Sequence, residues 1–392
     1  MDTGNEEDRV KTRTLNAYYG YSRSARQSLI EPRIKQYQSL SPANQAVVSD
    51  IIPPKIDALE SCIRVNSLFF TEVANGASEL FEAPDVNCWT PATVTDEEKM
   101  LATLKQITRE WTLEGYRERN QSFILLTRAL CMLFPLLDRQ IEFGPLEPGD
   151  IDLTEVIPND IIQQPQESRR SIRVLVPGCG LGRLPFEIFL RGFEVQGNEV
   201  SYHMLFAASY FLHSGITEQR KIHPFIHTTS HTKSRYDQLR SVPVPDINPT
   251  FVDFDSDYLG GMSMAAGSFD DVYGKHNKPS NALNYDVIVS CFFIDTSANI
   301  LQTLRTMHHA LKPGGFLINF GPLLWHFEGH TSDELTFSGG LEFTRDEVWT
   351  LLTRTGFQVV CSRSDIKCAY TANERAMGRF IYNCEFFVAV KV

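Results

Sequence analysis

The feature that most constrains this chain is a run of three alternate glycines, Gly178, Gly180 and Gly182, in VLVPGCGLGRL. The run follows a short apolar segment over 172–178 and precedes an apolar segment with helical spacing over 181–192. Glycine permits a sharp turn and lets a ligand approach the backbone. A strand that ends in such a loop and opens a helix is typical of nucleotide-binding α/β proteins. We therefore predict a cofactor loop here, with a tight turn that binds nothing as the alternative.

The glycine spacing distinguishes between cofactors. A dinucleotide fingerprint GxGxxG that began at Gly178 would need glycine at position 183, where Arg183 stands, so an NAD-linked oxidoreductase is disfavoured. The pattern GxGxG is instead typical of S-adenosylmethionine-dependent methyltransferases. Glu199 follows Gly178 by 21 residues, at the end of a predicted second strand over 193–199, where a carboxylate can accept hydrogen bonds from both ribose hydroxyls. A solvated loop acid is the alternative.

The remainder of the chain after residue 168 alternates short apolar segments with helical ones. This pattern indicates a mostly parallel sheet with helices on both faces, and therefore an α/β fold. The Pro- and Asp-rich segment at about 226–261 reads as an inserted loop. The further elements that we predict are strands over 285–293 and 316–320, two strands in the tail that begin near 356 and 385, and a helix over 299–311.

The first part of the chain has a different pattern, with apolar residues at helical spacing. Pro53 and Pro54 are well placed to begin one helix, and two more are predicted over 96–111 and 123–134. A polar segment over 144–168 reads as a connecting loop. We expect a helical region over 1–165 that covers the cofactor site and a Rossmann-like domain over 166–392.

Charge and composition limit the partners. With 48 acidic against 37 basic residues the chain carries a formal charge of -11, and its basic residues form no long runs, so we expect no nucleic-acid partner. No apolar run approaches the roughly 18 residues of a membrane span, and the polar, acidic N-terminus does not resemble a signal peptide. We expect no membrane partner and a cytoplasmic protein, with the nucleus as a second compartment. The eight scattered cysteines read as reduced thiols, and a homodimer is one candidate for the oligomeric state.

Longer motifs carry a narrower resemblance. They are LKQITREWTLEGYRER, PGCGLGRLPFEIFLRGFEVQGNEVSYHMLF, SCFFIDTSANI, LKPGGFLINFGPLLWHFE and AYTANERAMGRFIYNCEFFV. With these motifs the chain resembles the carnosine N-methyltransferase family. The resemblance covers roughly residue 50 to the end and implies a class I methyltransferase with a mostly parallel seven-stranded sheet and an α-helical N-terminal extension. It also implies that S-adenosylmethionine is the cofactor and that the substrate is a small dipeptide, carnosine, which is methylated on its imidazole ring to give anserine.

The resemblance also implies a cofactor site. Gln106 and Arg109, three residues apart on one helix face, resemble residues that reach the methionine carboxylate of the cofactor. Ser268 stands where the family typically has Asp, which puts a contact to the adenine amino group in doubt. The full set of cofactor-binding candidates is Gln106, Arg109, Gly178, Gly180, Glu199, Ser268, Phe269 and Cys291.

Four residues resemble the family's substrate pocket: Asp295, His326, Tyr370 and Tyr382. A carboxylate at 295 can accept the N–H of the non-reacting ring nitrogen and direct the other nitrogen at the methyl group, and His326 can share this role or receive the released proton. Asp295 and His326 are thus the catalytic candidates. The alternatives are a helix N-cap for Asp295, a core position for His326 and simple packing for the tyrosines.

Several questions stay open in the sequence. The substrate carboxylate needs a cation, for which Arg183, Lys233 and Arg235 are candidates. The pairs His227 with His231 and His308 with His309 have no convergent third ligand, so we predict no metal site. A methyltransferase for another acceptor, such as protein histidine, and a non-catalytic Rossmann scaffold are the alternative functions.

Overall fold

The computed structural model describes residues 3–85, 89–137, 151–213, 218–249, 252, 259–275, 281–329 and 340–392. Its contacts divide the chain into two units. The helical unit comprises Met1–Tyr116, Tyr202–Val252 and Thr371–Phe380. The sheet unit comprises Arg117–Ser201, Asp253–Tyr370 and Ile381–Val392.

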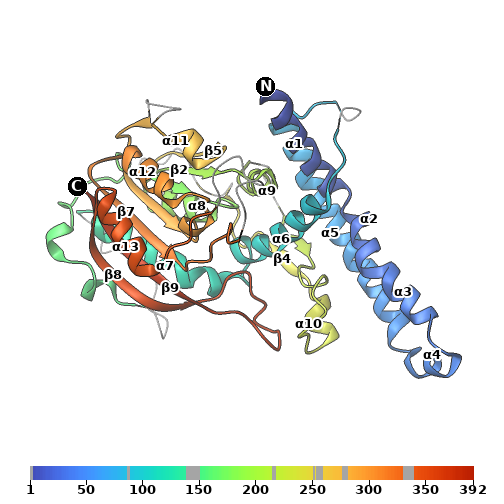
Figure 1. Cartoon of the computed structure of the whole chain (residues 1–392). Helices are drawn as coiled ribbons and strands as arrows, with labels where there is room; N and C mark the ends of the chain where they lie inside the picture. Colours follow the sequence, from blue (N-terminus) through green and yellow to red (C-terminus); the bar gives the residue numbers. More distant parts are fainter. Residues whose placement is uncertain are drawn as a thin grey trace. The chain divides into compact units, whose positions relative to one another are not determined.

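The sheet unit contains a seven-stranded sheet in the order β5-β2-β1-β6-β7-β9-β8 (Figure 1). The pairs from β5 to β7 are parallel, whereas β9 runs antiparallel to both β7 and β8. This confirms the α/β class and the mostly parallel seven-stranded sheet. The strands are β1 (Arg173–Pro177), β2 (Glu194–Glu199), β5 (Met262–Ala266), β6 (Tyr285–Cys291), β7 (Leu311–Gly321), β8 (Phe357–Cys368) and β9 (Tyr382–Lys391).

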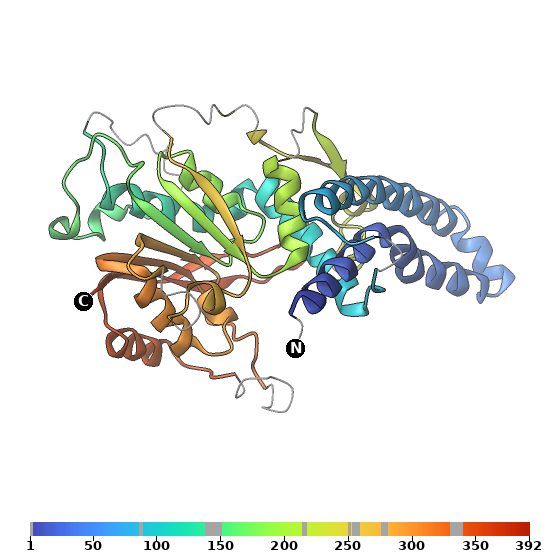
Figure 2. The ribbon, with the colours of Figure 1, turned by 90° about the horizontal axis from the view of Figure 1, so that it is seen from above.

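Helices cover both faces of this sheet, as its apolar strands require. On one face Leu317 lies in a buried cluster with Leu304 of α12 and Leu352 of α13. On the other face, just beyond α7, the ring of Phe134 meets Phe316 edge to face, with centroids 5.9 Å apart. Figure 2 shows α12 and α13, in orange and red, on one side of the sheet and α7, in teal, on the other. The helices are α7 (Tyr116–Leu133), α8 (Arg183–Phe189), α11 (Phe269–Tyr273), α12 (Ile300–Ala310) and α13 (Arg345–Arg354), with single 3-10 turns η3 (Leu153–Glu155), η4 (Asn159–Ile161) and η7 (Ile294–Thr296).

Two helices of the helical unit begin with sequence signals that are typical of helix N-termini. Pro53 and Pro54 lie in the first turn of its longest helix, as predicted, and Thr93 forms a capping box with Asp96 at the start of α6. The unit contains α1 (Thr3–Tyr19), α2 (Tyr21–Ala25), the π-helical turn η1 (Arg26–Ile30), α3 (Glu31–Gln38), α4 (Pro42–Val48), α5 (Ile52–Leu80), α6 (Val94–Trp111), α9 (Tyr202–His213), α10 (Arg235–Leu239) and the antiparallel pair β3 (Arg220–Ile222) and β4 (Val242–Val244).

Several elements differ from the sequence expectations. The helix expected over 123–134 begins earlier, at Tyr116, because its polar first turns are compatible with a helix even though they lack apolar periodicity. Part of the segment 226–261 that we expected to be a loop forms α10, capped by the Ser234 side chain, and β4, whose alternate residues are buried. Strand β5 was not predicted, since none of its residues is fully buried. Residues 138–150 of the expected connecting loop lie outside the described residues.

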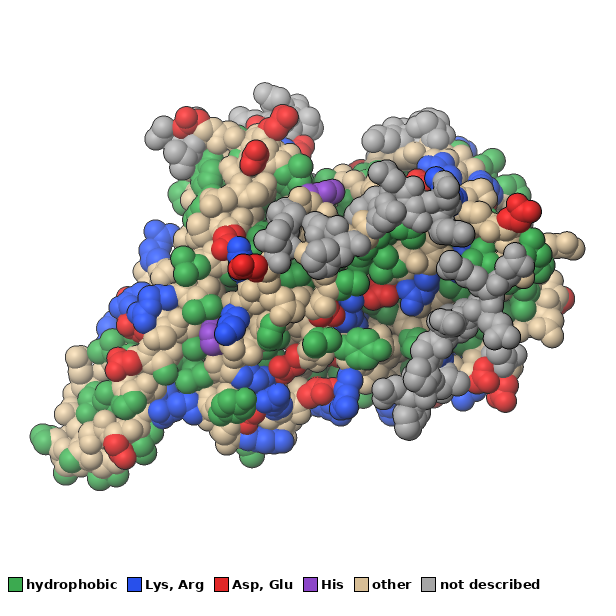
Figure 3. Space-filling view, turned by 180° about the vertical axis from the view of Figure 1, so that it is seen from behind, with side chains coloured by type: hydrophobic (Ala, Val, Ile, Leu, Met, Phe, Trp, Pro, Cys, Tyr) green, Lys and Arg blue, Asp and Glu red, His purple; other side chains and the backbone are tan. Residues whose placement is uncertain are grey.

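Acidic and basic side chains are interspersed on the surface shown in Figure 3. Several of them form ion pairs, such as Arg220 with Glu72 at 2.8 Å in the helical unit. In the part of the chain that the structure describes, no helix is both long enough and apolar enough to cross a membrane.

Candidate active site

The glycine loop joins β1 to α8 in the sheet unit. Gly178, Gly180 and Gly182 have φ angles of +59°, +56° and +77°, in the left-handed region that side chains other than glycine rarely adopt. At Gly178 there is also no room for a side chain, because a Cβ atom would lie 2.4 Å from Cδ2 of Phe293. The loop therefore depends on glycine for its backbone conformation and, at its first position, for space.

Glu199 lies at the end of β2 with its carboxylate turned toward this loop. One oxygen accepts the N–H of Gly180 at 2.9 Å, and the other accepts the N–H groups of Val200 and Ser201, both at 2.9 Å. The side chain is 8% exposed, so burial raises the pKa of the carboxyl, and the three N–H donors act in the opposite direction. Three of its roughly four acceptor positions are thus used by backbone, which leaves one for a ribose hydroxyl rather than the two that we expected.

Ser268 and Phe269 follow β5 and lie close to the same loop. The N–H of Gly267 donates to the Glu199 carbonyl at 2.9 Å, which ties this turn to the end of β2. Phe269 is buried, and its ring meets Phe293 edge to face at 5.5 Å. Because Phe293 also fills the space beside Gly178, the structure brings Gly178, Glu199, Ser268 and Phe269 into one neighbourhood.

Cys291 is the last residue of β6, and the strained residue Phe292 follows it. Phe292 has a φ angle of +51°, which is rare for an aromatic residue, and its N–H donates to the Phe320 carbonyl at 2.8 Å. Its ring lies 4.6 Å from that of Tyr370 and 6.0 Å from that of Tyr382, between centroids. The two tyrosines predicted for the substrate pocket are therefore brought together around one aromatic ring.

Asp295 lies in η7 and is 3% exposed. Its Oδ2 accepts the N–H of Leu324 at 2.8 Å, and its carbonyl accepts the N–H of His326 at 3.2 Å. Burial raises the pKa of the Asp295 carboxyl, whereas the Leu324 N–H and the nearby His326 act in the opposite direction. Burial also raises the pKa of the Tyr382 phenol, and the neighbouring Asp295 carboxylate adds to that effect. The alternative role as helix N-cap is wrong, because Asn299 caps α12.

The other cofactor candidates, Gln106 and Arg109, lie on α6 in the helical unit. Arg109 is buried, with a guanidinium nitrogen 3.9 Å from the Glu110 carboxylate. Of the cations considered for the substrate carboxylate, Arg183 is buried and pairs with Glu187 one turn along α8, at 3.1 Å. That pairing gives Arg183 a role within its own helix.

The histidines considered as metal ligands have other neighbours. His227 Nε2 lies 2.8 Å from the Tyr21 hydroxyl in the helical unit, and burial lowers the pKa of His227 to about 4. The His308 ring packs edge to face against Phe357 at 5.6 Å. Among the described residues, no group of three or more His, Cys, Asp or Glu side chains is arranged to hold a metal ion.

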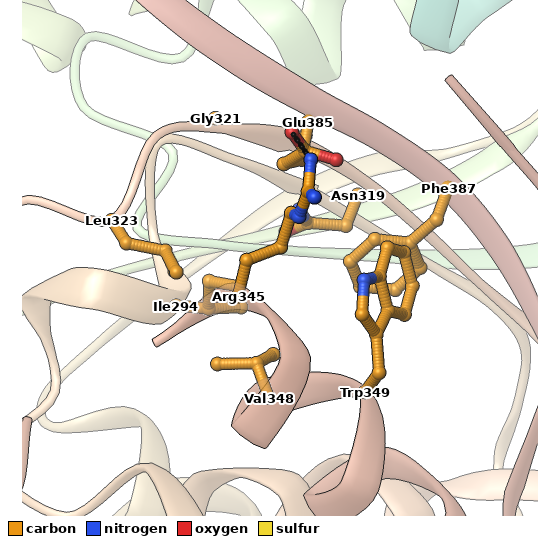
Figure 4. Close-up of a pocket in the computed structure, with 9 residues that line it drawn as sticks. All are labelled: Ile294, Asn319, Gly321, Leu323, Arg345, Val348, Trp349, Glu385 and Phe387. Atoms are coloured by element: carbon orange, nitrogen blue, oxygen red, sulfur yellow. Dashed lines mark hydrogen bonds and ion pairs between the residues drawn. The ribbon is translucent and has the colours of Figure 1, made fainter. Parts of the chain in front are cut away.

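A small hollow opens on the opposite face of the sheet from Phe320, and it contains the ion pair between Arg345 and Glu385 at 3.4 Å (Figure 4). Ile294 and Leu323, on its wall, directly precede Asp295 and its donor Leu324 in the sequence. The hollow therefore lies next to the backbone segments that carry Asp295 and its hydrogen-bond donor Leu324. Its lining residues are Ile294, Asn319, Gly321, Leu323, Arg345, Val348, Trp349, Glu385 and Phe387.

Three features of the site were missed by sequence reasoning: the Phe292 ring near both tyrosines, the Phe293 ring beside Gly178, and the Leu324 N–H that donates to Asp295. The run SCFFID did signal two aromatic residues directly after a strand, where α/β sheets bind ligands. The backbone donor has no signal in the sequence, because any residue except proline supplies one.

The strand order, the antiparallel β9, the glycine loop after β1 and the acid at the end of β2 together define a Rossmann-like methyltransferase domain. A family model described as Carnosine N-methyltransferase matches residues 152–392. Proteins of that name from Rattus norvegicus and Schizosaccharomyces pombe are 31% and 32% identical to this chain; each comparison covers 99% of it, and 88% and 97% of the relative. The chain belongs to the carnosine N-methyltransferase family, and it is a methyltransferase.

A solved structure of a methyltransferase is only distantly similar to this chain. A SAM-dependent methyltransferase from Methanosarcina mazei is 13% identical, with a TM-score of 0.36, and the match covers 57% of this chain and 93% of that one. This similarity is too low to add to what the strand order already shows.

Proposed function

We propose that this chain transfers a methyl group from S-adenosylmethionine to the imidazole ring of carnosine, giving anserine. The observation that carries the proposal is the similarity to two relatives of that name over 99% of the chain. The cluster of Asp295, His326 and Tyr382 supports it, because it supplies the groups that an imidazole needs. Asp295 follows by two residues Phe293, whose ring lies beside Gly178 of the glycine loop.

The residues around the glycine loop fit the cofactor. The left-handed glycine loop follows β1, and the Glu199 carboxylate beside it keeps one acceptor position for a ribose hydroxyl. We assign Phe269 and Ser268 to contacts with the adenine of the cofactor. The backbone of Cys291 is assigned to the same cofactor site. From the motif resemblance alone, we propose that Gln106 and Arg109 contact the methionine carboxylate.

When bound, the cofactor supplies an electrophilic methyl group on a sulfonium centre. The chain must hold the attacking nitrogen about 3 Å from that carbon and in line with the breaking bond. A free imidazole has a pKa near 6.5, so it is mostly neutral at pH 7 and needs no strong base. Positioning is therefore the main task of the pocket.

Asp295 performs that positioning in our proposal. Leu324 fixes its carboxylate through one backbone hydrogen bond, and the remaining acceptor positions can take the N–H of the non-reacting ring nitrogen. This contact selects the tautomer whose free nitrogen faces the methyl group, and it stabilises the cation that forms. The N–H proton then leaves through Asp295 or His326, while the rings of Tyr370 and Tyr382 enclose the imidazole.

The test is incubation of the purified chain with methyl-labelled cofactor and a panel of acceptors: carnosine, related imidazole dipeptides, free histidine and a protein extract. Mass spectrometry of the products should find the label on the imidazole ring of carnosine. Label in protein alone would reject the proposal in favour of protein histidine methylation. Cofactor binding without transfer to any acceptor would favour a non-catalytic scaffold.

A further inference from the structure

Two turns that lie far apart in the sequence form the proposed cofactor site, and both adjoin the end of β2. They are the glycine loop after β1 and the turn 267–269 after β5. Strand β2 lies between β1 and β5 in the sheet, and Asn198 of β2 pairs with Pro177 on one side and with Ala265 on the other. All of these residues belong to the sheet unit. Asn198 is therefore placed to contact both turns.

Asn198 forms hydrogen bonds with both turns. Its carbonyl accepts the N–H of Cys179, which stands between the first two glycines of the loop, at 3.0 Å. Its side-chain Nδ2 donates to the carbonyls of Ala265 and Gly267, at 3.1 and 3.0 Å. Because both partners are carbonyl oxygens, the nitrogen of the amide must face them. The residue is 2% exposed, so a buried amide ties the turn after β5 to the strand that also holds the glycine loop.

Gly267 is held at both of its polar backbone groups. Its carbonyl accepts the Asn198 amide, and its N–H donates to the Glu199 carbonyl at 2.9 Å. Its φ angle of +125° is one that few residues other than glycine adopt, and glycine has more backbone freedom than any other residue. Hydrogen bonds from outside the turn must therefore restrict it. Ser268 and Phe269, which we assign to the adenine of the cofactor, follow directly, so the direction in which the chain leaves Gly267 sets where they lie.

We propose that Asn198 is a positioning residue for the cofactor. Its side-chain amide holds the turn after β5 and its carbonyl holds the glycine loop, so the adenine-binding residues Ser268 and Phe269 stand at a fixed place relative to the glycines. This inference rests on the proposed function, of which the cofactor site is a part. It assigns Asn198 no contact with the cofactor, and it identifies the Gly267 carbonyl as the group through which Asn198 acts.

Asn198→Ala is the variant that tests the inference. It removes both side-chain hydrogen bonds and keeps the backbone contact with Cys179. A hydrogen bond between neutral groups corresponds to an effect of about two- to tenfold, so we expect the loss of two to raise the Kd for S-adenosylhomocysteine about tenfold in calorimetric titration. The KM for carnosine, and kcat at saturating cofactor, should stay within about threefold of the wild type, because the acceptor candidate Asp295 follows β6 and not β5.

Two further variants complete the test. Asn198→Asp keeps the size of the side chain but has no N–H donor for the two carbonyls, so it should weaken the cofactor at least as much as alanine does. Ser263→Ala is the matched control, because it removes another side-chain hydrogen bond between β2 and β5, from Gln196 at 3.1 Å, away from the turn. A Kd unchanged by Asn198→Ala, restored by Asn198→Asp or raised equally by Ser263→Ala would overturn the inference. An equal rise in the KM for carnosine would also overturn it, because it would indicate a general structural role.

Hydrogen exchange separates this inference from the proposed function. Without ligand, peptides that cover residues 265–273 should exchange faster in Asn198→Ala than in the wild type, and Ser263→Ala should resemble the wild type. Unchanged exchange in those peptides overturns the inference whether or not the cofactor binds. If the wild type gives no heat of binding with S-adenosylhomocysteine, the proposed cofactor site fails, and the exchange result still decides whether Asn198 fixes the turn.

Discussion

Replacing Glu199 by glutamine separates the two tasks of its carboxylate, which are to hold the glycine loop and to bind the cofactor. Glutamine has the same size but only one acceptor oxygen. If that oxygen keeps the N–H groups of Val200 and Ser201, the amide NH₂ faces the N–H of Gly180, which the carboxylate now accepts at 2.9 Å. One backbone donor then loses its partner at the base of the loop.

The magnitudes of the two effects differ. A buried donor left unsatisfied costs about 1–3 kcal/mol, but glutamine also removes a buried charge whose pKa burial raises, and this offsets part of the cost. We therefore expect the unfolding free energy to change by less than about 2 kcal/mol. The cofactor loses a hydrogen bond to a charged acceptor and meets a disturbed loop, so its Kd should rise about 10- to 100-fold.

Calorimetric titration with S-adenosylhomocysteine and denaturant unfolding of the same samples measure the two effects. Glu194→Gln is the matched control, because Glu194 lies at the start of the same strand and its carboxylate also accepts a backbone N–H, from Gly261. We expect that control to bind the ligand like the wild type. The reasoning is refuted if Glu199→Gln binds within about threefold of the wild type, or if Glu194→Gln weakens binding as much.

Two other substitutions probe the remaining parts of the site. Asp295→Asn should lower turnover about 10²- to 10⁴-fold while the cofactor Kd stays within about twofold, and weakened binding with normal turnover would contradict the assignment. Because burial raises the pKa of Asp295 in the folded state, its contribution to stability is full below the ordinary value of 3.8 and is lost as pH rises through the raised value. Unfolding measured across that range should therefore show Asp295→Asn gaining stability relative to the wild type with increasing pH. Gly178→Ala should lower the unfolding free energy by about 2–4 kcal/mol, because alanine is strained at a φ angle of +59° and its Cβ would collide with Phe293. The variant should also show no measurable cofactor binding. Wild-type affinity in calorimetric titration together with a wild-type melting temperature would refute this.

The fold was predictable where single segments carry their own signal. Strands β1 and β6 are buried on both faces, so their continuous apolar runs identify them, and the glycines between β1 and α8 are required by the backbone itself. Strand β5, MSMAA, occupies an edge of the sheet and has no fully buried residue. A segment that buries so little has no periodicity from which it can be recognised.

The site was less predictable, because its geometry depends on residues far apart in the sequence. Tyr382 reaches its place through the register in which it pairs with Cys368 across β8 and β9. No local pattern specifies that register, and only the family resemblance indicated the residue. The alternative role of Asp295 as a helix N-cap is wrong for a similar reason. Three polar residues, Asp295 to Ser297, stand shortly before α12, but η7 begins at Ile294 and Asn299 caps the helix instead.

The strained backbone of Phe292, near the acceptor pocket, shows how this site depends on the neighbouring strand β7. Phe292 keeps its positive φ angle, at a cost of roughly 1–3 kcal/mol, beside two consecutive residues of β7. Phe320 accepts its N–H, and Gly321 leaves the space in which a Cβ would lie 3.2 Å from the Phe292 backbone. A glycine on the neighbouring strand thus lies against the backbone of the residue whose ring is near Tyr370 and Tyr382. A side chain at position 321 would therefore press on the Phe292 backbone, although Gly321 presents no side chain to a substrate.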